Sequence, residues 1–152
     1  LINLSSPNNV TLADAQAVAA IVDDDAAILQ LAFGRATALD AVTLLREPFA
    51  ATNPVYFGSD KHGRVIVFTL NLVLTPGLVV TAQAVDDQQV THQLAVEFVG
   101  HVPSFIPQIP AEPALTQIVL KLPEGITTAG DLRVRIITRG RFSNQVVIAV
   151  KP

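Results

Sequence analysis

The sequence predicts an all-β fold, and two observations predict it. From residue 65 onward, apolar and polar residues alternate with a period of two, which is the side-chain spacing of a half-buried strand. Turn signals such as "TPG" (75–77) and "PEGITTAGD" (123–131) separate these stretches. Short strands punctuated in this way are typical of an antiparallel β-sandwich of immunoglobulin-like type, which we expect here.

The expected strands of the sandwich share a richness in Val, Ile, Thr and Phe, which fit a pleated, half-buried surface. In chain order they are "VIVFTLNLVL" (65–74), "VVTAQAVDD" (79–87), "VTHQLAVEFVGHV" (90–102), "LTQIVLKLP" (115–123), "LRVRIITR" (132–139) and "QVVIAV" (145–150).

The first 64 residues have a less regular pattern. Thr11 and Asp14 have the spacing of a capping box, which predicts a short N-terminal helix near residues 12–20. Gly34-Arg35 lies between two apolar stretches and predicts a tight hairpin turn. Prolines and glycines punctuate 46–64, so we expect mostly loop there.

The length of 152 residues favours one domain, which we place at 10–152 after an extended arm or linker at 1–9. Hydrophobic residues make up 50% of the chain and charged residues 15%, against roughly 25% charged in ordinary soluble domains. No apolar run approaches the roughly 18 residues that would predict a transmembrane segment. The apolar excess therefore fills a rich core or is buried against other copies or modules.

The chain contains no Cys and no Met. Without Cys there is no disulfide framework, thiolate nucleophile or Cys-type metal site. Because the sequence begins with Leu1, we expect a processed N-terminus or the edge of a fragment. Removal of a signal peptide is the simplest such processing, and it predicts an extracellular or cell-surface protein.

Several stretches occur in an order that resembles a known type of module: "ALDAVTLLREPF" (38–49), "VIVFTLNL" (65–72), "VTAQAVD" (80–86), "LAVEFVGHVPSF" (94–105), "LTQIVLKLPEGITTAGDLRVRI" (115–136) and "RGRFSNQVVIAV" (139–150). Over about residues 36–150 the chain looks like an immunoglobulin-like C-terminal module, of no assigned activity, of large secreted proteins from acidobacteria-like bacteria. The resemblance implies an extracellular β-module without catalytic residues. The segment 106–114 looks like an insertion, and 1–35 lies outside the resemblance.

Four arginines gather within nine residues near the end of the chain: Arg133, Arg135, Arg139 and Arg141. They could form a basic patch for an acidic partner or the solvated face of a strand. Because apolar residues alternate with Arg133 and Arg135 over 132–138, the solvated face is the favoured interpretation. A net charge of −3, with Phe142 as the one ring in the stripe, argues against nucleic acid as a partner.

Catalytic signals are sparse, and we expect no enzyme. No serine lies in a G-x-S-x-G setting, which a nucleophile elbow would require. His62, His92 and His101 lack the spacing of metal ligands. The glutamates are too scattered to nominate a glycosidase pair.

No cofactor is expected, although two acidic clusters are weak calcium candidates because calcium prefers clustered oxygen ligands. They are Asp23, Asp24 and Asp25, and the pair at 86–87. Neither has the spaced pattern of a dedicated calcium loop, so solvated turn acids are the alternative that we favour. Asn3 and Asn9 begin N-x-S/T triplets and are glycosylation candidates.

Two segments are candidates for assembly. Leu1, Ile2 and Leu4 form an apolar strip before a polar spacer, which fits an arm that completes the sheet of a neighbouring copy. A ragged terminus, or a strand within the chain's own sheet, is the alternative. Prolines such as Pro107 and Pro110, on either side of Ile109, favour an extended path suited to a partner, or a stiffened crossover between two sheets.

Two functions remain open from the sequence. The first is an extracellular structural protein that assembles with other copies of itself into a filament or surface layer, for instance by N-terminal donor-strand exchange. The second is a monomeric adhesion or ligand-binding module of a larger secreted protein, which recognises a carbohydrate or a surface glycan. The absence of Trp weakens the second, since saccharide sites normally offer aromatic platforms.

Overall fold

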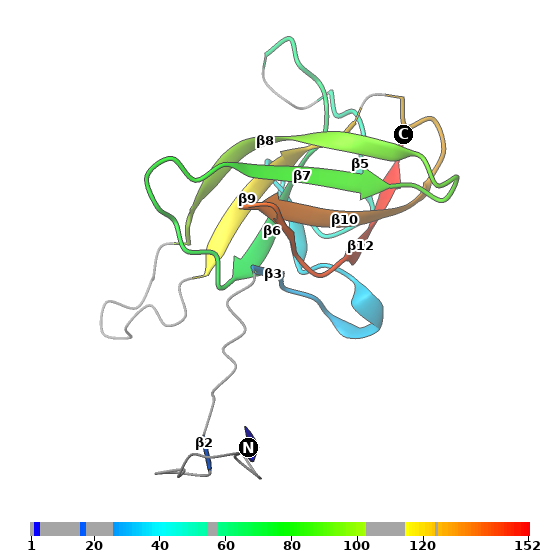
Figure 1. Cartoon of the computed structure of the whole chain (residues 1–152). Helices are drawn as coiled ribbons and strands as arrows, with labels where there is room; N and C mark the ends of the chain where they lie inside the picture. The colour runs from blue at the N-terminus through cyan, green and yellow to red at the C-terminus, as the bar shows by residue number, and fades with distance from the viewer. Residues whose placement is uncertain (1, 4–15, 18–25, 55–57, 103–114, 124) are drawn as a thin grey trace.

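Strands form almost all of the regular structure of the chain (Figure 1). The structure is a computed structural model that describes residues 2–3, 16–17, 26–54, 58–102, 115–123 and 125–152. One short 3₁₀ turn, η1 (Ala32–Gly34), is the helical element of this described part. None of the described residues forms a helix long and apolar enough to cross a membrane.

The main sheet contains ten of the described strands, in the order β3-β6-β9-β8-β7-β10-β12-β5, with β4 beside β6 and β11 beside β10. Their bounds are β3 (Ala27–Ile28), β4 (Ala38–Asp40), β5 (Phe49–Ala50), β6 (Arg64–Leu70), β7 (Val80–Val85), β8 (Thr91–His101), β9 (Thr116–Lys121), β10 (Gly130–Thr138), β11 (Arg141–Phe142) and β12 (Val146–Lys151).

The period of two in the sequence corresponds to a buried face on four of the long strands, β6, β9, β10 and β12. In β10, every second residue from Leu132 to Ile136 is buried, while the arginines between them are half-buried. The same alternation in β6, β9 and β12 supplies half of the largest fully buried side chains: Val65, Val67, Ile118, Leu120, Val146 and Ile148. The fold is therefore an all-β, sandwich-like curled sheet whose faces enclose an aliphatic core.

Strand β8 joins the two halves of the sandwich. Its first residues pair with β7, and its later residues pair with β9. The register shifts between Val96 and Phe98, where a bulge bends the strand from one half to the other.

A hairpin between β3 and β4 closes one margin of the sheet by crossing from β6 to β12. The backbone N–H of Ala36 donates to the carbonyl of Val147 at 2.9 Å. Beside it, the side chain of Asn144 bonds both backbone groups of Ile28: its Oδ1 accepts from N–H at 2.7 Å, and its Nδ2 donates to C=O at 2.9 Å. The amide of Asn144 thus makes the two hydrogen bonds to β3 that a neighbouring strand would otherwise make.

Strand β5 links β12 and β6 at a second place along the sheet. It pairs with β12 in parallel, and the N–H of Ala51 donates to the carbonyl of Lys151 at 2.7 Å. On its other side, the N–H of Gly63 donates to the carbonyl of Ala51 at 2.7 Å. This short segment therefore connects β12 to the start of β6, and few backbone groups remain open along the margins.

The strands expected from residue 65 onward are confirmed, with bounds that differ by a few residues, and so is the Gly34-Arg35 hairpin. The helix near 12–20 is wrong where it can be compared: β2 (Gln16–Ala17) pairs with β1 (Ile2–Asn3) as a separate two-stranded sheet. The backbone groups of Gln16 and Ala17 therefore pair with another strand and not with a helical turn. The capping-box spacing in the sequence is a weak signal by comparison. The other residues of 12–20 lie outside the described ranges, and the division into arm and domain stays a prediction.

Candidate functional site

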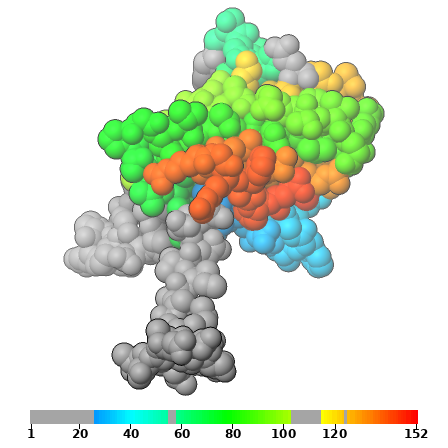
Figure 2. Space-filling view, in the orientation of Figure 1, coloured from blue at the N-terminus to red at the C-terminus, as the bar shows by residue number. Residues whose placement is uncertain are grey.

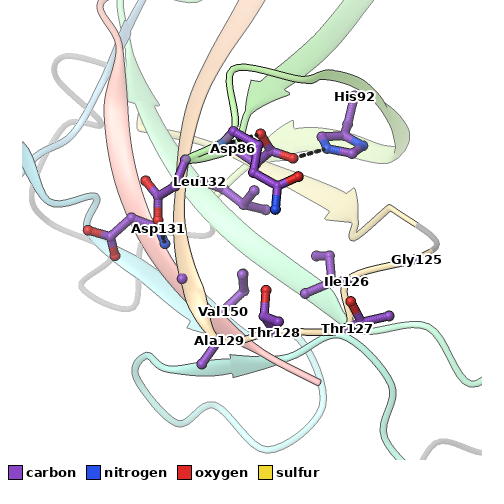
Figure 3. A pocket seen from close by; sticks show the side chains of 13 residues that line it. Asp86, His92, Gly125, Ile126, Thr127, Thr128, Ala129, Asp131, Leu132 and Val150 are labelled. Carbon is purple, nitrogen blue, oxygen red and sulfur yellow. Dashed lines mark hydrogen bonds and ion pairs between the residues drawn. The ribbon is translucent and has the colours of Figure 1, made fainter.

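A hollow of about 230 Å³ lies at the end of the sandwich where the β7–β8 turn meets the loop before β10 (Figure 3). Its floor is apolar and includes the buried side chains of Leu132 and Val150. Its rim is polar, with Asp86 and His92 on one side and Thr127 and Thr128 on the other (Figure 3). We call this the acidic end, defined by Asp86, Asp87, Asp131 and the loop 125–129.

The acid at the start of the β7–β8 turn shapes that turn. Oδ1 of Asp86 accepts hydrogen bonds from the N–H of Gln88 at 2.9 Å and of Val90 at 2.8 Å. Oδ2 of Asp86 lies 2.9 Å from Nε2 of His92. The hydrogen bond from His92, together with that from Val90, lowers the pKa of the Asp86 carboxyl from its ordinary value. Asp86 is therefore a structural turn acid whose charge is compensated.

The neighbouring carboxylates at this end differ in their partners. Asp87 accepts from the backbone N–H of Asp131 at 3.2 Å, and no cationic side chain of the described residues contacts it. Asp131 instead pairs with Arg35, at 3.1 Å between Oδ1 and Nη1. A Cβ on Gly130 would lie 3.1 Å from Oδ2 of Asp87, so glycine permits this close approach. Asp87 is thus an exposed anion on the rim of the hollow.

The polar residues that line the hollow are Asp86, Asp87, Gln88, His92, Thr127, Thr128 and Asp131. Within the described ranges, His92 contacts no hydroxyl group that it could activate as a nucleophile, and its one hydrogen-bond partner is Asp86. No three His, Asp or Glu side chains of the described chain are placed to hold a metal ion. An apolar floor beside an unneutralised carboxylate and two hydroxyls suits a cationic or hydroxyl-rich group with an apolar stem.

The loop before β7 and the turn after β10 lie at the opposite end of the sandwich (Figure 1). Their residues are basic and apolar. A hollow of about 350 Å³ there is lined by Leu72, Val73 and Leu78, with Arg139 and Arg141 beside them. Three large apolar side chains are exposed near it: Val73 at 65%, Val79 at 70% and Phe142 at 52%. We call this the basic end, defined by the loop 71–79 and residues 139–142.

Arg139 is the exposed cation at the centre of the basic end. Its Nη2 donates to Oγ1 of Thr75 at 3.2 Å, and no carboxylate of the described residues pairs with it. The charge of Arg139 is therefore as uncompensated as that of Asp87 at the other end.

The first half of the arginine stripe contacts the chain's own groups. Nη2 of Arg133 donates to the carbonyl of Asp86 at 3.1 Å. Arg135 lies 4.1 Å above the ring centre of Phe142, and the amide oxygen of Gln83 accepts from its guanidinium. Leu132, Val134 and Ile136 are buried and alternate with the two arginines. This burial confirms the outward-facing orientation predicted for Arg133 and Arg135. In Figure 2, β7 and β10 lie side by side on the visible face.

An ionic cluster lies on the outer side of β6, β8 and β9. Arg64 and Lys121 face each other across paired strands, and Asp60 accepts hydrogen bonds from both at 2.9 Å. Glu97 adds a second carboxylate, 2.7 Å from Nε of Arg64. The ammonium of Lys121, followed by His62, holds the pKa of Asp60 far below its ordinary range. The mutual neutralisation of these groups indicates a structural role for the cluster.

Most site residues predicted from the sequence lie outside the described ranges: Leu1, Leu4, Asn9, Asp23, Asp24, Asp25, Pro107, Ile109 and Pro110. The assembly, calcium and Asn9 glycosylation assignments for them stay predictions. Ile2 and Asn3 form β1, which pairs with β2 in a two-stranded sheet separate from the main sheet. The assembly role of Ile2 and the glycosylation of Asn3 stay predictions. The three histidines do not gather into a metal cluster in the part of the chain that is described.

The hollow at the acidic end could not be predicted from the sequence, which indicates 86–87 only as turn acids or a weak calcium candidate. Its rim combines the β7–β8 turn with a loop almost forty residues later, and the register of Val85 opposite Arg133 brings the two together. The "DD" doublet at 86–87 and the "TT" doublet at 127–128 were its visible signals. Comparisons of the chain with protein-family models, functionally described proteins and solved structures find no match.

Proposed function

We propose that the chain is an extracellular structural module that assembles with other copies of itself into filaments or surface layers. The observation that carries the proposal is the apolar basic end, where Val73, Val79 and Phe142 are each more than half exposed. Exposed apolar patches of this kind mark contact surfaces more often than open solvent faces. Burial of these side chains against another copy would remove them from water and stabilise the contact.

The composition supports the same proposal. Charged residues make up only 15% of the chain, and half of the residues are hydrophobic. Phe33, at the tip of the β3–β4 hairpin, is fully exposed, and Leu44 and Leu45 are exposed in the loop after β4. An apolar excess on the surface as well as in the core is expected of a protein that buries part of its surface on assembly.

The test is negative-stain electron microscopy of the purified chain beside a version that starts at Asn8, which lacks the apolar strip of the leader. We expect filaments or sheets from the full chain. Loss of assembly on truncation would assign the contact to the leader, as in donor-strand exchange, whereas assembly by both versions would assign it to the folded body. Dispersed single molecules in both samples, at every concentration, would overturn the proposal.

The hollow at the acidic end favours a second candidate, a monomeric adhesion or ligand-binding module. A hollow between loops at one end of a sandwich is a common position for a ligand. None of its described lining residues is Phe, Tyr or Trp, which leaves a saccharide without the usual stacking platform. Titration of monomeric protein with saccharides, followed by amide chemical shifts, tests this candidate: shifts confined to 86–92 and 125–131 would favour it.

A further inference from the structure

The two ends of the sandwich are chemically complementary, and one strand connects them. β10 contains Asp131 near its first residue, at the acidic end beside Asp87. Arg139 directly follows the last residue of β10 at the basic end. At about 3.4 Å per residue, the eight residues from Asp131 to Arg139 span about 27 Å. The exposed carboxylate of Asp87 and the exposed guanidinium of Arg139 therefore cannot meet within one molecule.

From this complementarity we propose that copies of the chain contact each other end to end, with Arg139 of one copy in the acidic hollow of the next. The inference rests on the proposed function and names its contact. A guanidinium suits this hollow because Asp87 supplies an uncompensated carboxylate and Leu132 and Val150 supply an apolar floor for the methylene stem.

The surroundings of both groups fit the same contact. Beside Arg139, the exposed side chain of Val79 lines the same shallow hollow. Around the hollow, the loop 125–129 is mostly exposed and carries the small residues Gly125 and Ala129, which let another surface approach closely. The approach of the loop 125–129 to the basic end would thus reduce the access of water to the ion pair.

The geometry also predicts the form of the assembly. The two surfaces differ, so the contact is heterologous, and every assembly keeps one free acidic end and one free basic end at its two extremities. Repetition of the contact extends along the direction of β10 and does not close by two-fold symmetry. The expected product is a linear filament whose repeat is close to the length of one sandwich.

The experiment uses two charge reversals in the full chain, Asp87→Arg and Arg139→Asp. Each variant alone places like charges at the proposed contact, and its self-association, measured by sedimentation velocity, should weaken about tenfold or more. An equimolar mixture should recover association, because the reversed hollow of one variant then faces the reversed basic end of the other. Both residues are exposed, and retained far-UV circular dichroism verifies that each variant folds.

Arg46→Asp is the matched control for Arg139→Asp, since it makes the same change in net charge at an exposed arginine outside both ends. It should associate like the unaltered chain. If the unaltered chain assembles and both reversals assemble equally well, the end-to-end contact is wrong while the proposed function stands. Weakened association without recovery in the mixture also overturns the contact. If the unaltered chain itself stays monomeric, the proposed function fails first.

Discussion

Asn144 is one of the half-exposed polar residues near the margin between β3 and β12. Of these residues, it is the one whose replacement should destabilise the fold most, here by alanine. Ile28 is 2% exposed, and its N–H and C=O point away from β6, since β3 bonds to β6 through neighbouring residues such as Leu29. The amide of Asn144 is the partner of both groups. Asn144→Ala therefore leaves one donor and one acceptor unsatisfied in a buried place.

Each unsatisfied buried group costs about 1–3 kcal/mol, and partial access of water at this margin favours the lower part of that range. We expect Asn144→Ala to lower the free energy of unfolding by about 2–4 kcal/mol. Urea unfolding followed by far-UV circular dichroism measures this loss. With a slope of about 2 kcal/mol per molar urea, the midpoint should fall by about 1–2 M.

Gln145→Ala is the control, because Gln145 is the exposed neighbour and no hydrogen bond of its side chain joins the two margins. It should change the free energy of unfolding by less than about 0.5 kcal/mol. An Asn144→Ala midpoint equal to that of Gln145→Ala would refute the claim that this side chain closes the sheet.

Three further predictions concern the core, a close backbone contact and acid stability. Leu120→Ala, at a fully buried site, should cost about 2–5 kcal/mol in urea unfolding, and a loss below 1 kcal/mol would show that β9 does not lie in the core. Gly63→Ala should cost about 1–3 kcal/mol by the same assay, because its Cβ would clash with the carbonyl oxygen of Ala50; an unchanged midpoint would contradict this contact. Because the pKa of Asp60 is lowered in the folded state, chiefly by Lys121, its contribution to stability is present above the ordinary aspartate pKa near 4 and is lost as the pH falls below it. Asp60→Asn should therefore flatten the acid limb of a stability–pH profile, and an unaltered limb would refute the assignment.

The strands could be predicted from the sequence because their signal is local. In β10 and β12, buried and outward residues alternate without interruption, so neighbouring positions alone indicate the strand and its buried face. The hairpin tip at Gly34 was equally local, since a left-handed conformation there favours glycine.

The closure of the sheet could not be predicted, because it depends on partners far apart in the chain. β5 has only two residues and lies in a stretch punctuated by proline, so nothing local distinguishes it from loop. Asn144 bonds a residue 116 positions away, and only the folded register places the two side by side. The hollow at the acidic end has the same origin, since it exists only once β7 and β10 pair.

The most direct test of self-assembly is sedimentation equilibrium of the full chain over a wide range of concentration, at low and at high salt. The account predicts an average mass that rises with concentration above the 16.1 kDa of one chain and falls again as salt screens the charged ends. A mass that stays at that of one chain under all of these conditions would contradict self-assembly and leave ligand binding at the acidic hollow as the better account.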